Sequence, residues 1–196
     1  MATSIISRRG NHRVRGQAEG GFSLLEVLIS IVLLTVGLVS LLGVFVLAMA
    51  ATQTSQQDMI AKQLANEALE SIITARNTSQ ITWDQIQNIV NGGIFLNGAN
   101  PIYNAGADGI VGTADDLLAG EQTLIDPGPD GIFGTADDIQ VPLTGYQRTI
   151  QLLPVYDSSN NLVPTLRSIN ITVQYSATQA NLPKTYVLSS FISQYR

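Results

Sequence analysis

One long apolar stretch dominates the N-terminal part of the chain. No ionisable side chain lies between Glu26 and Asp58, and residues 27–51 are almost all aliphatic or small. Because about 20 apolar residues in a helix cross the hydrocarbon core of a membrane, this stretch predicts a transmembrane helix. Over residues 52–76, apolar residues recur at helical spacing with polar and charged residues between them. We therefore expect the helix to continue as an amphipathic segment that ends near Arg76.

Toward the C-terminus the period of the apolar pattern changes to two. Ile169, Ile171 and Val173 alternate with polar residues, as in a strand with one buried face. Similar runs lie on either side of this one, separated by turn-forming residues at 157–161 and 180–183. The predicted strands span residues 147–156, 167–175 and 184–193. An antiparallel sheet over residues 146–196, laid on the amphipathic segment of the helix, gives an α+β head.

Residues 77–145, between the helix and the sheet, contain an internal repeat and are expected to form loops. The sequence of residues 104–116 is repeated, with a few differences, 22 positions later at residues 126–138. We call these segments copy one and copy two. Both contain the string Asp-Gly-Ile-x-Gly-Thr-Ala-Asp-Asp, where x is Val111 in copy one and Phe133 in copy two.

Each copy partly matches the twelve-residue calcium loop of the EF-hand. That loop has oxygen-bearing side chains at its first, fifth and last positions, glycine at the sixth and a carbonyl ligand at the seventh. Val111 and Phe133, at the eighth position, are expected to point inward and fix each loop to the head. Glycine at the third position and the absence of predicted flanking helices depart from the EF-hand, so an acidic surface loop without an ion is the alternative. The candidate Ca²⁺ ligands are Asn104, Asp108, Ile110, Asp115, Asp116, Asp126, Asp130, Ile132, Asp137 and Asp138.

Charge and composition exclude several classes of function. Residues 1–21 carry a net charge of +3 and the remainder −8. By the positive-inside rule, the N-terminus is cytoplasmic and the head lies outside the cytoplasm. An acidic head argues against nucleic-acid binding. The chain has no cysteine, and its single histidine, His12, lies in the basic leader; we therefore expect that the protein is not an enzyme.

Glu26 requires a positive partner, because an acidic group at membrane depth is costly when it is unpaired. No lysine or arginine lies between Glu26 and Lys62, so the partner must come from another chain or from a newly made N-terminal amine. The string Gly21-Phe22-Ser23-Leu24-Leu25-Glu26-Val27-Leu28, after a basic leader, resembles the class III signal of type IV pilins and pseudopilins. This resemblance implies that prepilin peptidase cleaves after Gly21 and methylates Phe22. It also implies that Glu26 pairs with the terminal amine of a neighbouring subunit during assembly.

The same resemblance implies the pilin fold and a role as a minor pilin in a type IV pilus or its initiating tip complex. Residues 1–21 would be the cleaved leader, and residues 22–51 would lie in the inner membrane before they contact other pilin subunits in the filament. The closing residues 188–192 resemble the minor pilins known as type IV pilus modification protein PilV. Three alternatives stay open: a minor pseudopilin of a type II secretion system, a non-assembling single-pass protein with a calcium-binding head, and a secretory signal cut after Ala50.

Overall fold

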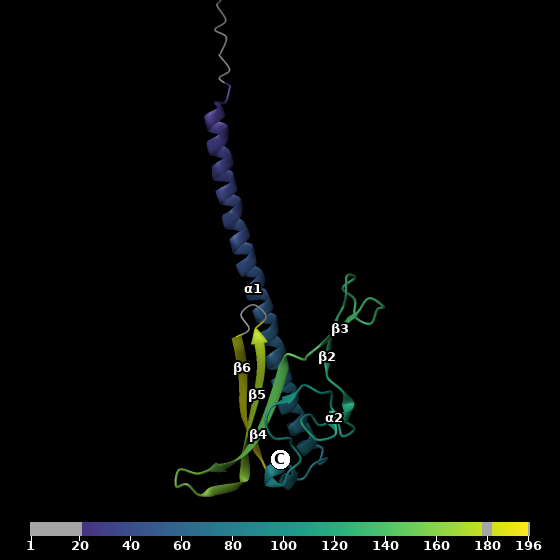
Figure 1. The fold of residues 1–196 in the computed structure, drawn as a ribbon. Coiled ribbons are helices and arrows are strands. Elements are labelled where there is room, and N and C mark those ends of the chain that lie inside the picture. The colour runs from purple at the N-terminus through teal and green to yellow at the C-terminus, as the bar shows by residue number, and fades with distance from the viewer. Residues whose placement is uncertain (1–20, 178–181, 196) are drawn as a thin grey trace, which may run out of the picture. The chain divides into compact units, whose positions relative to one another are not determined.

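The structure, a computed structural model, describes residues 21–177 and 182–195 of the chain (Figure 1). Apart from Gly21, the predicted leader lies outside these residues. The chain forms two compact units, residues 1–47 and 48–196. Helix α1 (Leu24–Asn77) has 54 residues and contributes to both units. Its C-terminal end agrees with the prediction to within one residue.

The part of α1 in the first unit, up to Leu47, has its apolar side chains exposed. None of its residues is buried, and even Val27 keeps 47% of its surface accessible. The helix is long and apolar enough to cross a membrane, which confirms that part of the prediction. Such a surface is stable only when lipid or apolar side chains of other molecules cover it.

The second unit contains a four-stranded antiparallel sheet with the strand order β1-β4-β5-β6. The prediction of an antiparallel sheet after the helix is confirmed. A two-residue strand, too short for any period in the sequence, adds a fourth strand at one edge. The turn predicted at 157–161 joins β4 to β5. Of the other predicted turn, residues 180 and 181 lie outside the described residues, and residues 182 and 183 already belong to the last strand. The strands are β1 (Asn100–Pro101), β4 (Tyr146–Tyr156), β5 (Leu162–Ala177) and β6 (Leu182–Ser193).

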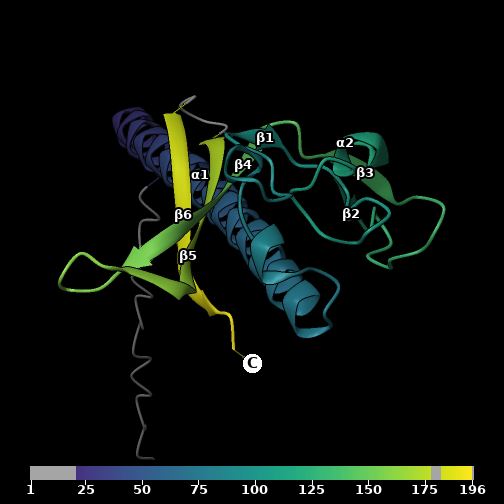
Figure 2. The same cartoon turned by 90° about the horizontal axis from the view of Figure 1, so that it is seen from below.

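The core of the second unit lies between α1 and one face of this sheet (Figure 2). Alanines repeat on the buried side of the helix, and Ala61, Ala65 and Ala68 are completely buried. Small side chains allow the helix backbone to approach the sheet closely, and branched residues such as Ile169 and Ile171 fill the space opposite. The α+β arrangement, with the helix on one face of the sheet, is thus as predicted.

The segment between helix and sheet contains more structure than the expected loops. It has two 3-10 turns, a short helix α2 (Asp116–Ala119) and a hairpin of β2 (Thr123–Asp126) with β3 (Ile139–Pro142). Asn88 fastens the segment to the sheet, since its buried amide donates to the carbonyl of Ile150 (2.7 Å) and accepts from the N–H of Leu152 (2.9 Å). The hairpin pairs only with itself and carries copy two between its strands.

Candidate functional site

The residues of the predicted processing signal stand at the beginning of α1. Phe22 precedes the helix with 83% of its surface exposed, and Glu26 lies in the first helical turn. A carboxylate in the first turn is favoured by the helix dipole. In the described part of the chain the two ion pairs are Arg148–Glu67 and Lys184–Asp58. Neither includes Glu26, so any cation that pairs with it comes from outside the described residues.

The two acidic copies share most of their local conformation. In each, three matching backbone N–H groups and a threonine hydroxyl donate to aspartate carboxylates, and the same hydroxyl donates to an isoleucine carbonyl. Two pairs of matching glycines agree, with φ of 69° at Gly109 and 70° at Gly131, and of 91° at Gly112 and 88° at Gly134, whereas Gly128 has a φ of 66° and Gly106 has no positive φ. The bonds in copy one are Asp108 N to Asp115 Oδ2 (3.1 Å), Ile110 N to Asp108 Oδ1 (2.7 Å), Gly112 N to Asp116 Oδ2 (2.5 Å), and Thr113 Oγ1 to Asp115 Oδ1 (2.6 Å) and the Ile110 carbonyl (3.1 Å). Those in copy two are Asp130 N to Asp137 Oδ2 (3.3 Å), Ile132 N to Asp130 Oδ1 (2.8 Å), Gly134 N to Asp138 Oδ2 (2.7 Å), and Thr135 Oγ1 to Asp137 Oδ1 (2.6 Å) and the Ile132 carbonyl (3.0 Å).

Copy one brings three of the predicted calcium ligands together. One carboxylate oxygen from each of Asp108, Asp115 and Asp116 lies within 4.8 Å of the others. The backbone N–H and the side-chain amide of Asn104 both donate to the carbonyl of Gly120 (3.0 and 3.4 Å). The carbonyl of Ile110 accepts the hydroxyl of Thr113. The structure therefore gathers three of the predicted carboxylate ligands.

The pKa values of the neighbouring residues Asp115 and Asp116 shift in opposite directions. The hydroxyl of Thr113 and the N–H of Asp108 lower the pKa of Asp115. Burial raises the pKa of Asp116, although backbone N–H groups of Gly112 and Gly106 partly offset this effect. Asp116 is 2% exposed and accepts the N–H of Gly106 (2.8 Å) as well as that of Gly112.

Copy two has hydrogen bonds that match most of those made among residues 108–116 in copy one, but its carboxylates do not converge in the same way. In the described chain its four aspartates form no group comparable to that of copy one. Asp138 Oδ1 is buried and has no hydrogen-bond partner, whereas the matching oxygen of Asp116 accepts the N–H of Gly106. The N–H of Gly128, which occupies the place of Gly106, is directed to Asp126 (3.3 Å) instead. In copy two the hydroxyl of Thr135 lowers the pKa of Asp137.

The expected inward orientation of the eighth position is correct for one copy and wrong for the other. Val111 is 2% exposed, but Phe133 is 68% exposed. The hydrogen bonds and the glycine conformations next to the eighth position match in both copies, so the local loop conformation does not cause the difference. It arises because copy one lies against α1 and the sheet, whereas copy two lies at the end of the β2–β3 hairpin (Figure 1).

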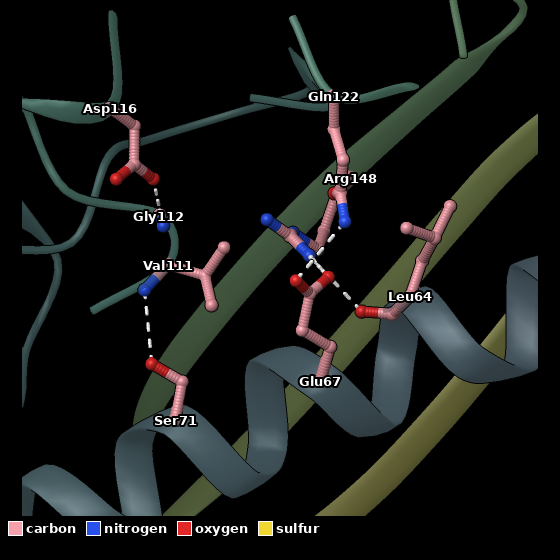
Figure 3. A network of polar contacts seen from close by, with 8 residues as sticks. All are labelled: Leu64, Glu67, Ser71, Val111, Gly112, Asp116, Gln122 and Arg148. Atoms are coloured by element: carbon pink, nitrogen blue, oxygen red, sulfur yellow. Dashed lines mark hydrogen bonds and ion pairs between the residues drawn. The ribbon is translucent and has the colours of Figure 1, made fainter. Parts of the chain in front are cut away.

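A polar network that the sequence analysis missed holds copy one and the sheet to α1 (Figure 3). Arg148 on β4 is 5% exposed and donates to the carbonyl of Leu64 and to Glu67 Oε2, each at 3.1 Å. Gln122 donates to the other oxygen of Glu67 (3.3 Å). Burial lowers the pKa of Arg148, and the charge of Glu67 opposes this shift. The sequence did carry one signal, since Arg148 occupies an inward position of an alternating strand, in phase with Ile150.

Two sets of residues thus carry candidate chemistry in the described chain. The first is the exposed Gly21–Glu26 segment with the apolar helix that follows it, and the second is the pair of acidic copies. A scan against protein-family models and searches of curated proteins and of solved structures find no match to this chain.

Proposed function

We propose that the chain is a minor pilin, cleaved by prepilin peptidase after Gly21 and assembled through its N-terminal helix into a type IV pilus or its initiating tip. The observation that carries the proposal is the position of Glu26. It is the only ionisable residue in the apolar part of α1, in the first turn, five residues after Gly21. The exposed apolar surface of the helix and the α+β head later in the chain support the same function.

The carboxylate of Glu26 would fix the position of one subunit against the next. A carboxylate in an apolar environment is strongly destabilising when it is alone, but paired with an amine it is tolerated. Cleavage after Gly21 creates such an amine at Phe22, four positions before Glu26. In the proposed assembly the amine of one subunit meets the carboxylate of its neighbour, and this pairing selects one axial offset between the two subunits.

Mass spectrometry of the N-terminus of the full chain, isolated from its own cells, tests this proposal. We expect a mature chain that begins with N-methylated Phe22. An intact Met1 would identify a membrane protein that is not processed as a pilin, and a chain that begins at Ala51 would identify a cleaved secretory signal. Either result would exclude the proposed function. A control in cells without prepilin peptidase should retain the leader.

Calcium binding by copy one is a second part of the proposal. Three carboxylates converge there within 4.8 Å, and carboxylate oxygens are the ligands that Ca²⁺ prefers. In copy two, the buried Asp138 Oδ1 without a hydrogen-bond partner is compatible with a cation or water. Between Arg76 and Arg148 the chain has no basic residue to neutralise these acids. Millimolar Ca²⁺ outside the cell suffices for weak sites of this kind.

A further inference from the structure

Copy one shows how a loop of this sequence docks on a protein surface. Ile110 and Val111 are each 2% exposed. The N–H of Val111 donates to Ser71 Oγ on α1 (3.0 Å), and Val111 lies over this turn of the helix (Figure 3). The carbonyl of Gly112 accepts the N–H of Leu96 (2.8 Å). Two apolar side chains and the polar groups of the loop backbone thus engage the head together.

The fit of copy one is close. A Cβ atom added at Gly112 would lie 2.4 Å from Cδ1 of Ile150, a distance that real Cβ atoms do not show. The glycine therefore allows the loop to approach the core. At Gly134, the matching position of copy two, φ is nearly the same (88° against 91°), but no atom lies within 4 Å of an added Cβ.

Copy two presents the same docking surface with nothing against it in the described chain. Ile132 is 60% and Phe133 is 68% exposed. The hydrogen bonds of residues 127–138 are all made within copy two, including Asp126. The counterparts of the Val111 N–H and the Gly112 carbonyl, which copy one uses for docking, are therefore free of protein partners among the described residues.

The charge around Phe133 limits what can cover it. Four aspartates flank the apolar pair within six residues along the chain, and no lysine or arginine lies nearby in the sequence; they are Asp126, Asp130, Asp137 and Asp138. Four carboxylates at the loop oppose insertion into an anionic lipid surface. The Ser71 turn of a second copy of this chain is not available, because each molecule already covers that turn with its own copy one.

We propose that copy two is an intermolecular docking loop that binds a helical surface of a different protein, in the way that copy one binds α1. The partner surface has a small or hydroxyl side chain to accept the N–H of Phe133. It has apolar residues beside this acceptor for Ile132 and Phe133, and a neutral or basic surrounding. This inference rests on the two copies alone and does not depend on the pilin assignment.

The absence of cysteine in the chain allows a direct test. Single variants Phe133→Cys, Leu118→Cys and Val111→Cys of the full chain are labelled with a membrane-impermeant maleimide, once after purification in detergent and once in their own cells. In the purified chain we expect labelling at positions 133 and 118, which are 68% and 91% exposed, and none at buried position 111. In cells we expect position 133 to lose its labelling while position 118 keeps it.

Three labelling outcomes would overturn the proposal. Equal labelling of Phe133→Cys in cells and in detergent means that nothing covers the loop. Loss of labelling in protein-free vesicles of phosphatidylethanolamine and phosphatidylglycerol means that lipid covers it. Loss of labelling when the purified chain is concentrated means that a second copy covers it.

The nature of the partner surface is tested by crosslinking in cells. A photoreactive phenylalanine analogue at position 133 should crosslink to a helical segment of another protein, mapped by mass spectrometry of the joined peptides. A crosslink to a strand or an extended loop would contradict the proposal even if the labelling results agree with it. The same analogue at exposed position 118 is the control and should not give this product.

Discussion

At the scale of single residues, the alternating pattern of β4 indicates that Arg148 is buried, but it does not show which groups accept its hydrogen bonds. Arg148 lies at a position of β4 whose side chain faces the core, in line with the buried residues Ile150 and Leu152. A buried guanidinium is tolerated only when acceptors surround it. Its acceptors, the carbonyl of Leu64 and the carboxylate of Glu67, lie more than 80 positions earlier in the chain. Their approach to Arg148 is a product of the fold.

The substitution Glu67→Ala tests this network. We expect it to lower the free energy of unfolding by about 1–3 kcal/mol, because it leaves the buried guanidinium with one acceptor fewer. Lys184→Ala is the matched control, since it breaks the partly exposed pair Lys184–Asp58 and should cost at most about 1 kcal/mol. Urea unfolding of the full chain in detergent, followed by tryptophan fluorescence of Trp83, measures both. Equal losses for the two variants would contradict the special role of Arg148.

At the scale of elements, comparison of the two acidic copies shows which features depend on local sequence and which depend on tertiary contacts. From Asp108 to Asp116 and from Asp130 to Asp138 the same nine-residue pattern gives matching hydrogen bonds and matching glycine conformations, whereas Gly106 and Gly128 before them differ. Burial of the eighth position differs completely, because it depends on what lies opposite the loop. Sequence reasoning therefore predicted the orientation of Val111 correctly and that of Phe133 wrongly.

Removal of calcium tests the cluster in copy one. Chymotrypsin should cut after Leu118, which is 91% exposed on the short helix α2 beside Asp116. We expect millimolar Ca²⁺ to slow this cleavage and a chelator to restore it, because an ion joined to Asp115 and Asp116 holds the start of α2. Asp115→Asn should be cut at the same rate under both conditions. Equal digestion of the unaltered chain with calcium and with chelator would count against the site.

At the scale of the whole molecule, the apolar helix and the head have separate tasks in the proposed function. The substitution Glu26→Leu should leave membrane insertion and cleavage after Gly21 unchanged, because the helix becomes only more apolar. Incorporation into filaments should be lost, since the amine of the neighbouring subunit then has no carboxylate partner. Immunoblots of sheared filaments and of membranes measure the two steps. Ser30→Leu, one turn further along the same helix, is a control that should still assemble.

The sequence by itself determined the elements in which a regular pattern of apolar residues continues over many positions, or in which a short motif fixes the backbone. These are α1 with its change from apolar to amphipathic, the alternating strands of the sheet and the hydrogen-bonded conformation that residues 108–116 share with residues 130–138. Such features depend on neighbours within a few residues, where side-chain spacing and backbone preference decide. The tertiary structure alone decided which residues meet across long separations. It added the short strand β1, brought Glu67 to Arg148, buried copy one and left copy two exposed, because each of these depends on which surface another part of the chain occupies.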